Sequence, residues 1–272
     1  MMNDQQFRRL LNRFQFSWEG YRKVRKGVKK RIHRYMTSIH CHTIEDFLAE
    51  LDRNYDVRDH CERLMTVSVS RFFRDRALWQ GLKENILPEF MKVGSSKFRF
   101  WSAGCACGEE VYSFKILWDC MSNTYIRLPD LDVFATDMNP VYLDRARNGI
   151  YPPSSLKEVT KEISSKYFDQ KSGQKLFEVK SSLKKGITWE KHHLLSNPPG
   201  LDFDIIFLRN NILTYYADSL RTKAFRNVIT RLKPRGILVL GSHEQIPFET
   251  QDLVKVEPHP YVLRKRQKNT MV

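Results

Sequence analysis

The amino-acid sequence predicts an α/β protein with a largely parallel sheet, a small all-helical N-terminal domain and a small β-hairpin insert. Two patterns support this fold class. From residue 98 onward, short apolar runs alternate with amphipathic helical patterns, which is typical of parallel strands joined by helices. In the first 90 or so residues, the apolar side chains recur at the three- and four-residue spacing of helices.

A basic amphipathic helix is expected between Trp18 and Met36. Its apolar face consists of Tyr21, Val24, Val28, Ile32 and Tyr35. The other faces carry eight cations with no acidic residue among them, namely Arg22, Lys23, Arg25, Lys26, Lys29, Lys30, Arg31 and Arg34. Thr43 and Asp46 form a pattern similar to a capping box at the start of a further helix. We therefore expect residues 1–92 to form a helical domain.

Residues 93–272 are expected to form the sheet domain, because a polar joint with glycine and serine at 94–96 precedes the first apolar stretch that predicts a strand. Strands are expected at 98–101, 131–135, 203–208 and 237–240, and helices at 109–120, 140–147 and 219–232. The alternation is interrupted between 154 and 193. There, the runs 175–179 and 187–190 flank a turn at 184–186 and predict a hairpin, in an insert at about 170–192.

The composition narrows the class of protein. No run approaches the roughly 18 apolar residues of a membrane span, and the N-terminus is polar where a signal peptide would be apolar. Five cysteines, an odd number, predict free thiols in a reducing compartment. We therefore expect a cytoplasmic protein, and take it to be a monomer. The net charge of +15 favours an acidic partner: a nucleic acid, an anionic membrane surface or a Glu-rich protein segment.

A glycine turn follows the first strand of the predicted sheet. The strand that ends near Ser102 leads into Gly104-Cys-Ala-Cys-Gly108, and a helix begins with Glu109-Glu110. Ligands of open α/β sheets bind at the carboxyl ends of the strands, where glycine lets the backbone approach them. The two glutamates occupy the helix N-terminus at which a phosphate would be held, and there is no Gly-Lys-Ser/Thr. A cationic cofactor without phosphate is therefore favoured.

A carboxylate lies at the end of the second expected strand. Asp137 follows the first glycine by about 30 residues, a position from which an acid accepts both hydroxyls of a ribose in nucleoside-binding folds. The alternative is that the glycines only turn the chain and that Asp137 caps the following helix.

These segments resemble the CheR-type family of chemotaxis-receptor glutamate methyltransferases, from about Phe14 to the C-terminus. Five motifs occur in the family's order: Phe72-Phe73-Arg74-Asp75, Trp101-Ser-Ala-Gly-Cys-Ala-Cys-Gly-Glu-Glu110, Ala135-Thr-Asp-Met138, Asp204-Ile-Ile-Phe-Leu-Arg209-Asn210 and Leu232-Lys-Pro-Arg-Gly236. The resemblance implies a Rossmann-like methyltransferase sheet, the cofactor S-adenosylmethionine and the product S-adenosylhomocysteine.

The resemblance also implies roles for individual residues. Arg74 would bind the methionine carboxylate, because a guanidinium suits a planar carboxylate. The other implied cofactor residues are Ser68 and Ser70 beside Arg74, Gly104 and Gly108 in the turn, Glu110 at the methionine end, Asp137 at the ribose, His193 and Leu194 around the adenine, and Arg209 and Asn210 below. Of these, Arg74, Glu110, Asp137, Arg209 and Asn210 match the family's residue types.

Three departures from the family pattern concern the acceptor more than the cofactor. The family's aromatic residue after Arg-Asn aligns with Thr214, unless one inserted residue brings Tyr215 into its place. His193 replaces a usual Asn or Asp, and Gly-Ser-His-Glu at 241–244 replaces Gly-His-Ser-Glu. A carboxylate acceptor needs no general base at neutral pH, so alignment carries the step. Tyr215 is the expected orienting group; the alternative is that it only packs beneath the sheet edge.

The basic helix has two interpretations, a solvated face or a docking surface for a Glu-rich acceptor. The resemblance favours docking, with Arg25, Lys26, Lys29 and Lys30 facing an acidic protein substrate such as a chemoreceptor cytoplasmic helix. The hairpin insert corresponds to the family's β-subdomain, which in some members tethers a receptor tail.

Several alternatives remain at this point. Asn197-Pro-Pro-Gly200 is similar to the motif of methyltransferases acting on adenine, but it precedes the strand 203–208 and lacks the aromatic residue. The Cys105-x-Cys107 and His40-Cys41-His42 spacings do not match zinc sites, and no metal is expected. A small molecule, another protein or RNA as acceptor, and a regulator without catalysis, are the other hypotheses.

Overall fold

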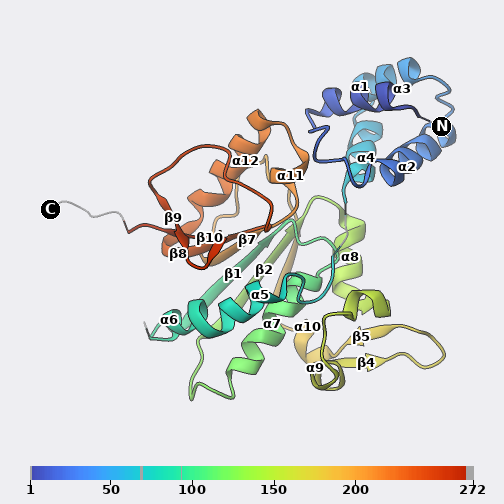
Figure 1. Ribbon diagram of the computed structural model, residues 1–272. Helices are drawn as coiled ribbons and strands as arrows, with labels where there is room; N and C mark the ends of the chain where they lie inside the picture. Colours follow the sequence, from blue (N-terminus) through green and yellow to red (C-terminus); the bar gives the residue numbers. More distant parts are fainter. Residues whose placement is uncertain (1, 68–69, 93, 268–272) are drawn as a thin grey trace.

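The computed structural model describes residues 2–67, 70–92 and 94–267, and places a seven-stranded sheet at the centre (Figure 1). The strands, in spatial order, are β6 (Ile187–Lys191), β2 (Asp130–Asp137), β1 (Lys97–Ala103), β7 (Phe203–Leu208), β8 (Leu232–Leu240), β10 (His259–Lys265) and β9 (Leu253–Val256). The first five are parallel, and β10 runs antiparallel to both its neighbours. The predicted largely parallel sheet is confirmed.

Both faces of this sheet are buried, which explains the continuous apolar runs of its central strands. In β7, Ile205 and Phe207 contribute to one hydrophobic cluster, whereas Phe203, Ile206 and Leu208 contribute to the other. The first face is covered by the helices α5 (Arg76–Gly81), η1 (Leu82–Ile86), α6 (Leu87–Met91), α7 (Glu109–Met121) and α8 (Pro140–Asn148). The second face carries α11 (Ile212–Tyr215) and α12 (Asp218–Thr230).

The N-terminal helices are α1 (Asp4–Phe14), α2 (Arg25–Ser38), α3 (Ile44–Arg53) and α4 (Tyr55–Met65) (Figure 1). Both sides of the Thr43–Asp46 capping box are present, as expected. The basic helix begins at Arg25, later than the predicted Trp18, because residues 18–24 form turns that lead into it. No helix of the described residues has the length and apolar content to cross a membrane.

The helices from 76 to 91 pack on the sheet and not on α1–α4. Leu78, Leu82 and Leu87 share one hydrophobic cluster with Phe100 and Phe207 of the sheet. The expected boundary at 92/93 would separate residues that lie in the same core. We therefore propose a domain boundary within 66–75, between α4 and α5.

The insert is a separate three-stranded antiparallel sheet that contains a hairpin formed by 168–170 and 177–179, whereas the predicted pairing of 175–179 with 187–190 is wrong. Its strands are β3 (Ile150–Tyr151), β5 (Phe177–Val179) and β4 (Phe168–Gln170), with η2 (Pro153–Leu156), α9 (Lys161–Tyr167) and α10 (Ser181–Lys184) around them. Strand β5 pairs with β3 and β4, and β6 instead pairs with β2, in register from Val133 and Ile187 onward. The turn of α10 and Gly186 carries the chain to the open edge of β2, where parallel hydrogen bonds are available.

The loop after α1 fastens the helical domain to the sheet domain. Residues Phe16 and Tyr216 form an isolated antiparallel bridge, with Ser17 N donating to Tyr215 O and Ala217 N to Gln15 O, both at 2.8 Å. The chain comes so close here that a Cβ on Gly20 would collide with the backbone carbonyl of Thr214. Glycine is therefore required at position 20 by the approach of two backbones.

A pair of glycine substitutions tests this contact. We expect Gly20→Ala to lower the free energy of unfolding by about 1–3 kcal/mol, because a main-chain carbonyl cannot move aside as a side chain can. Gly27→Ala is the matched control: Gly27 lies inside α2 with nothing near its Cβ position, and alanine should stabilise the helix by about 0.5–1 kcal/mol. Denaturant unfolding of both variants measures the difference, and equal effects would contradict the close approach.

Candidate active site

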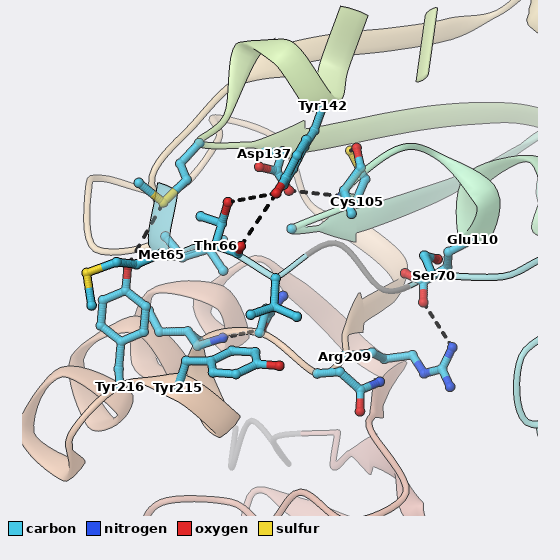
Figure 2. A pocket seen from close by; sticks show the side chains of 18 of the residues that line it. Met65, Thr66, Ser70, Cys105, Glu110, Asp137, Tyr142, Arg209, Tyr215 and Tyr216 are labelled. Carbon is cyan, nitrogen blue, oxygen red and sulfur yellow. Dashed lines mark hydrogen bonds and ion pairs between the residues drawn. The ribbon is translucent and has the colours of Figure 1, made fainter. Parts of the chain in front are cut away.

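A pocket lies at the carboxyl ends of β6, β2, β1 and β7, between the sheet edge and the N-terminal helices (Figure 2). Most of the predicted cofactor residues line it: Ser70, Arg74, Gly104, Glu110, Asp137, His193, Leu194, Arg209 and Asn210, together with Tyr215. Ser68 lies outside the described residues. The fold thus places side chains from five separate segments of the chain around one pocket, as expected from the sequence.

The glycine turn shapes the pocket through its backbone. Gly104 has a φ of +84°, and a Cβ there would collide with the side-chain amide of Asn211. The N–H groups of Gly104 and Cys105 both donate to Thr136 O at 2.8 Å, which ties the turn to the end of β2. Asn211, which sequence analysis missed, donates to Ala103 O and so braces the same turn from β7.

Gly108, which was expected to be a cofactor residue, is not among the residues that line this pocket. It is the N-cap of α7 with a φ of +87°, and a Cβ there would lie 2.8 Å from Cβ of Ala146 and 3.0 Å from the Trp189 ring. Glycine permits the left-handed backbone conformation at this N-cap, and the missing Cβ lets the start of α7 lie close to α8 and β6.

Asp137 holds the glycine turn and the residue that caps α8 in place, and it also lines the pocket. Its Oδ2 accepts from Ala106 N and its Oδ1 from Asn139 N, both at 2.9 Å, and Asn139 in turn caps α8. The residue is 8% exposed and lines the pocket. Burial raises the pKa of Asp137 to about 6, against the two backbone hydrogen bonds that lower it. Each oxygen accepts one backbone hydrogen bond and keeps acceptor capacity for a ribose hydroxyl.

Glu110 is held by a buried cation. Arg209 Nη1 donates to its Oε2 at 3.0 Å, and Ser102 Oγ donates to its Oε1 at 3.0 Å. Through Nη2, the same guanidinium pairs with Asp75. Burial raises the pKa of Glu110, and the charge of Arg209 opposes that shift. Arg209, expected as a direct cofactor residue, is therefore first of all the counterion of Glu110 and Asp75.

Glu244 organises the floor of the pocket, a role that the sequence did not reveal. Its Oε2 accepts from the N–H groups of Asn210 and Gly241, both at 2.8 Å, and its Oε1 from Thr214 Oγ1 at 2.6 Å. The ends of β7 and β8 and the start of α11 thus meet on one carboxylate. The only signal for it was its place as the last residue of the Gly-Ser-His-Glu segment.

Tyr215, and not Thr214, belongs to the pocket lining. The Tyr215 ring extends into the pocket in Figure 2, and it packs on Tyr21 with 5.0 Å between ring centroids. Burial raises the pKa of Tyr215, so its hydroxyl stays protonated and is a donor at neutral pH. Thr214 is instead bound to Glu244, so Tyr215 is the residue of this pair that presents its side chain to the pocket.

The helical domain supplies a wall of the pocket that sequence analysis missed entirely. Phe16, Tyr21, Glu62, Met65 and Thr66 all belong to it. Apolar residues of amphipathic helices and turns carry no signal of a ligand, since the same pattern is required for packing.

The four cations of the predicted docking surface lie on α2, away from the pocket lining. Arg25 and Lys29 are paired with Asp4 of α1 at 3.7 and 2.8 Å, and Arg25 also stacks on Trp18. Lys26 and Lys30 are exposed. Two of the four cations therefore share one carboxylate within the domain, and the other two remain exposed. No group of three or more His, Cys, Asp or Glu side chains with metal-binding geometry occurs in the described part of the chain.

The donor set fits S-adenosylmethionine. Gly104 lines the pocket, Asp137 has acceptor capacity for a ribose, and the buried carboxylate of Glu110 suits the ammonium of the methionine end. Arg74 would bind the methionine carboxylate. Fold and pocket together define the class of S-adenosylmethionine-dependent methyltransferases.

Comparison with known proteins identifies the family within this class. The family described as CheR methyltransferase, SAM binding domain, matches residues 68–262, and the chain belongs to it. A chemotaxis protein methyltransferase of Listeria monocytogenes is 29% identical over 80% of this chain and 81% of its own length. Chemotaxis protein methyltransferase 1 of Vibrio cholerae is 27% identical over 88% and 87%, and a chemotaxis protein methyltransferase of Borreliella burgdorferi 30% identical over 74% and 72%.

The pH dependence of cofactor binding tests Asp137. Its pKa of about 6 means that the carboxyl group is protonated at lower pH, where it accepts ribose hydroxyls poorly. The affinity for S-adenosylhomocysteine should therefore be highest above about pH 7 and fall by up to about tenfold per pH unit below about pH 6. Titration calorimetry of Asp137→Asn should show weak binding with no step near pH 6, whereas Asp144→Asn, at an exposed position of α8, should behave as the wild type.

Proposed function

We propose that this methyltransferase transfers a methyl group to the side-chain carboxylate of glutamate in an acidic protein segment, such as a cytoplasmic helix of a chemoreceptor. The relatives named above are chemotaxis protein methyltransferases, which supports this acceptor. The cofactor, when bound, supplies an electrophilic methyl group on its sulfonium.

The observation that carries the proposal is that the two histidines of the pocket and the carboxylates of Glu110 and Asp137 each already hold a hydrogen-bond partner. His193 is engaged with Glu62, and His192 Nε2 with Asn197 O at 2.9 Å. Glu110 is bound to Arg209, and Asp137 to two backbone N–H groups. A hydroxyl or ammonium acceptor would need one of them as a general base. A carboxylate is already ionised at neutral pH and needs only alignment.

Tyr215 is proposed to provide this alignment. Its backbone is fixed by the bond from Ser17 N, and its ring is fixed by packing on Tyr21. Because burial raises the pKa of Tyr215, the hydroxyl remains a donor that can orient one oxygen of the acceptor carboxylate. A rigid donor of this kind restricts the approach of the attacking oxygen without removing a proton.

The exposed cations of α2 are proposed to bind the acidic acceptor. Lys26, Lys30 and Arg34 lie exposed on the helix, and Arg22 and Lys23 lie exposed just before it. Arg25 and Lys29 contribute less, because Asp4 already neutralises part of their charge. We further propose that the enzyme is a cytoplasmic monomer, consistent with five cysteines that are free thiols and with an acceptor in the cytoplasm.

Methyl-ester chemistry provides the direct test of the acceptor. The purified enzyme is incubated with S-adenosylmethionine labelled in the methyl group and a lysate of the source cells that contains membranes. Base-labile label on acidic membrane proteins is the expected result, since carboxyl esters hydrolyse in base. Label on RNA or a small molecule, or base-stable label on protein, would contradict the glutamate assignment.

Charge reversal tests the docking surface. The double substitution Lys26→Glu and Lys30→Glu should raise KM for the acceptor by about tenfold at low salt and less at high salt, because exposed charges are screened. The affinity for S-adenosylhomocysteine should not change. The double variant Lys83→Glu and Lys223→Glu, at exposed sites on η1 and α12, makes the same change in net charge elsewhere. If both double variants raise KM equally, overall charge and not α2 is responsible.

A further inference from the structure

A polar cluster joins the helical domain to the sheet domain inside the pocket. It consists of Glu62 on α4, His193 after β6 and Tyr216 after α11. His193 Nε2 lies 3.2 Å from Glu62 Oε1, and the Tyr216 hydroxyl donates to the same oxygen at 3.1 Å. Glu62 and His193 are 131 positions apart in the sequence, so only the fold brings them together.

The hydrogen bonds of the cluster determine which atoms donate. Leu195 N donates to His193 Nδ1 at 3.1 Å, so Nδ1 is the acceptor and the Nε2–H donates to Glu62. Both neighbours of Glu62 Oε1 are therefore donors. Glu62 Oε2 accepts no hydrogen bond from residues 2–67, 70–92 or 94–267, while the residue lines the pocket. One carboxylate oxygen is thus fixed, and the other remains available to a ligand.

The order of the strands indicates which part of the cofactor lies beside this oxygen. Across the sheet edge, β6 leads to His193, β2 to Asp137, β1 to Gly104 and β7 to Arg209. Arg209 and Glu110 mark the amino-acid end, and Asp137 suits the ribose in the middle. An extended nucleoside cofactor then has its base on the β6 side. Figure 2 shows the same order, with Tyr216 at one end of the pocket, Glu110 at the other and Asp137 between them.

The walls around the cluster suit a flat aromatic ring. Phe16, Met138 and Leu194 line the pocket beside Tyr216, and the Phe16 and Tyr216 rings lie edge to face at 4.5 Å. Adenine presents to its surroundings a 6-amino group with two donor hydrogens, whereas hypoxanthine presents an acceptor oxygen at that position. A free carboxylate oxygen attracts the first and repels the second.

We propose that Glu62, oriented by His193 and Tyr216, recognises the 6-amino group of the adenine and makes the enzyme discriminate against cofactors with a 6-oxo base. Glu62 is then a specificity-determining residue supplied by the helical domain, and His193 and Tyr216 are positioning residues. The inference rests on S-adenosylmethionine as cofactor and is independent of the acceptor.

The test compares the binding of S-adenosylhomocysteine and S-inosylhomocysteine to the full chain by titration calorimetry. The wild type should bind the inosine analogue roughly 10- to 100-fold more weakly, as expected for a lost hydrogen bond to a charged group. In Glu62→Gln, the donors His193 and Tyr216 should hold the amide oxygen, so the amide NH₂ faces the base. The preference should then be reversed, because an NH₂ donor suits the 6-oxo group.

Two further variants complete the test. Tyr216→Phe keeps the ring packing and removes one orienting donor, and should reduce the preference for adenine severalfold. Glu249→Gln, at an exposed position outside the pocket, should leave it unchanged. Equal affinity of the wild type for the two compounds would overturn the proposal, even if Glu62→Gln failed to fold. An unaltered preference in folded Glu62→Gln would overturn it as well, whereas absent methylation of carboxylates would affect only the proposed acceptor.

Discussion

The buried guanidinium of Arg209 is the interaction on which the site depends. It pairs with Glu110 at the start of α7 and with Asp75 before α5, and thereby joins the end of β7 to two other segments of the chain. The Arg209 side chain is only 4% exposed. Removal of its carboxylate partners would therefore leave the guanidinium charge buried without a counterion or solvent. Because Asp75 directly follows Arg74, the same cation also fixes the segment that is to bind the methionine carboxylate. One residue therefore holds both Glu110 and the segment next to Arg74, the two groups proposed to bind the amino-acid end of the cofactor.

The second constraint is that the sheet domain does not complete the pocket by itself. The segment from 15 to 21 is hydrogen-bonded to the chain around Tyr215 and Tyr216, and Glu62 reaches the base end from α4. The helical domain that carries the proposed acceptor surface therefore also contacts the proposed cofactor site. Any change in the position of this domain relative to α11 would alter the cofactor contacts and the acceptor position together. Both depend on the backbone hydrogen bonds between residues 15–17 and 215–217.

Much of the site could be predicted from the sequence because strand ends are local features. A glycine turn after a strand and an acid after the next one lie at the same edge of a parallel sheet, whatever the rest of the chain does. Gly104 and Asp137 were recognisable for this reason, whereas the role expected of Glu110 came from the family resemblance. Gly108 was not separable from Gly104, because a left-handed φ looks the same in sequence whether it faces a ligand or a helix. The predicted pairing of 175–179 with 187–190 was wrong because β-periodicity does not specify a strand's partner. Strand β6 pairs instead with β2, some 50 residues earlier in the chain.

The sequence by itself determined the fold class, the family and the residues at the strand ends, since these follow from periodicity and from short motifs. The tertiary structure decided which of the cations on α2 remain exposed, that Arg209 serves Glu110, and that Tyr215 and not Thr214 enters the pocket. It alone produced the Glu62, His193 and Tyr216 cluster. The physical reason is that charge pairing, burial and hydrogen-bond orientation are properties of neighbours in space, and these neighbours come from helices and loops far apart in the chain.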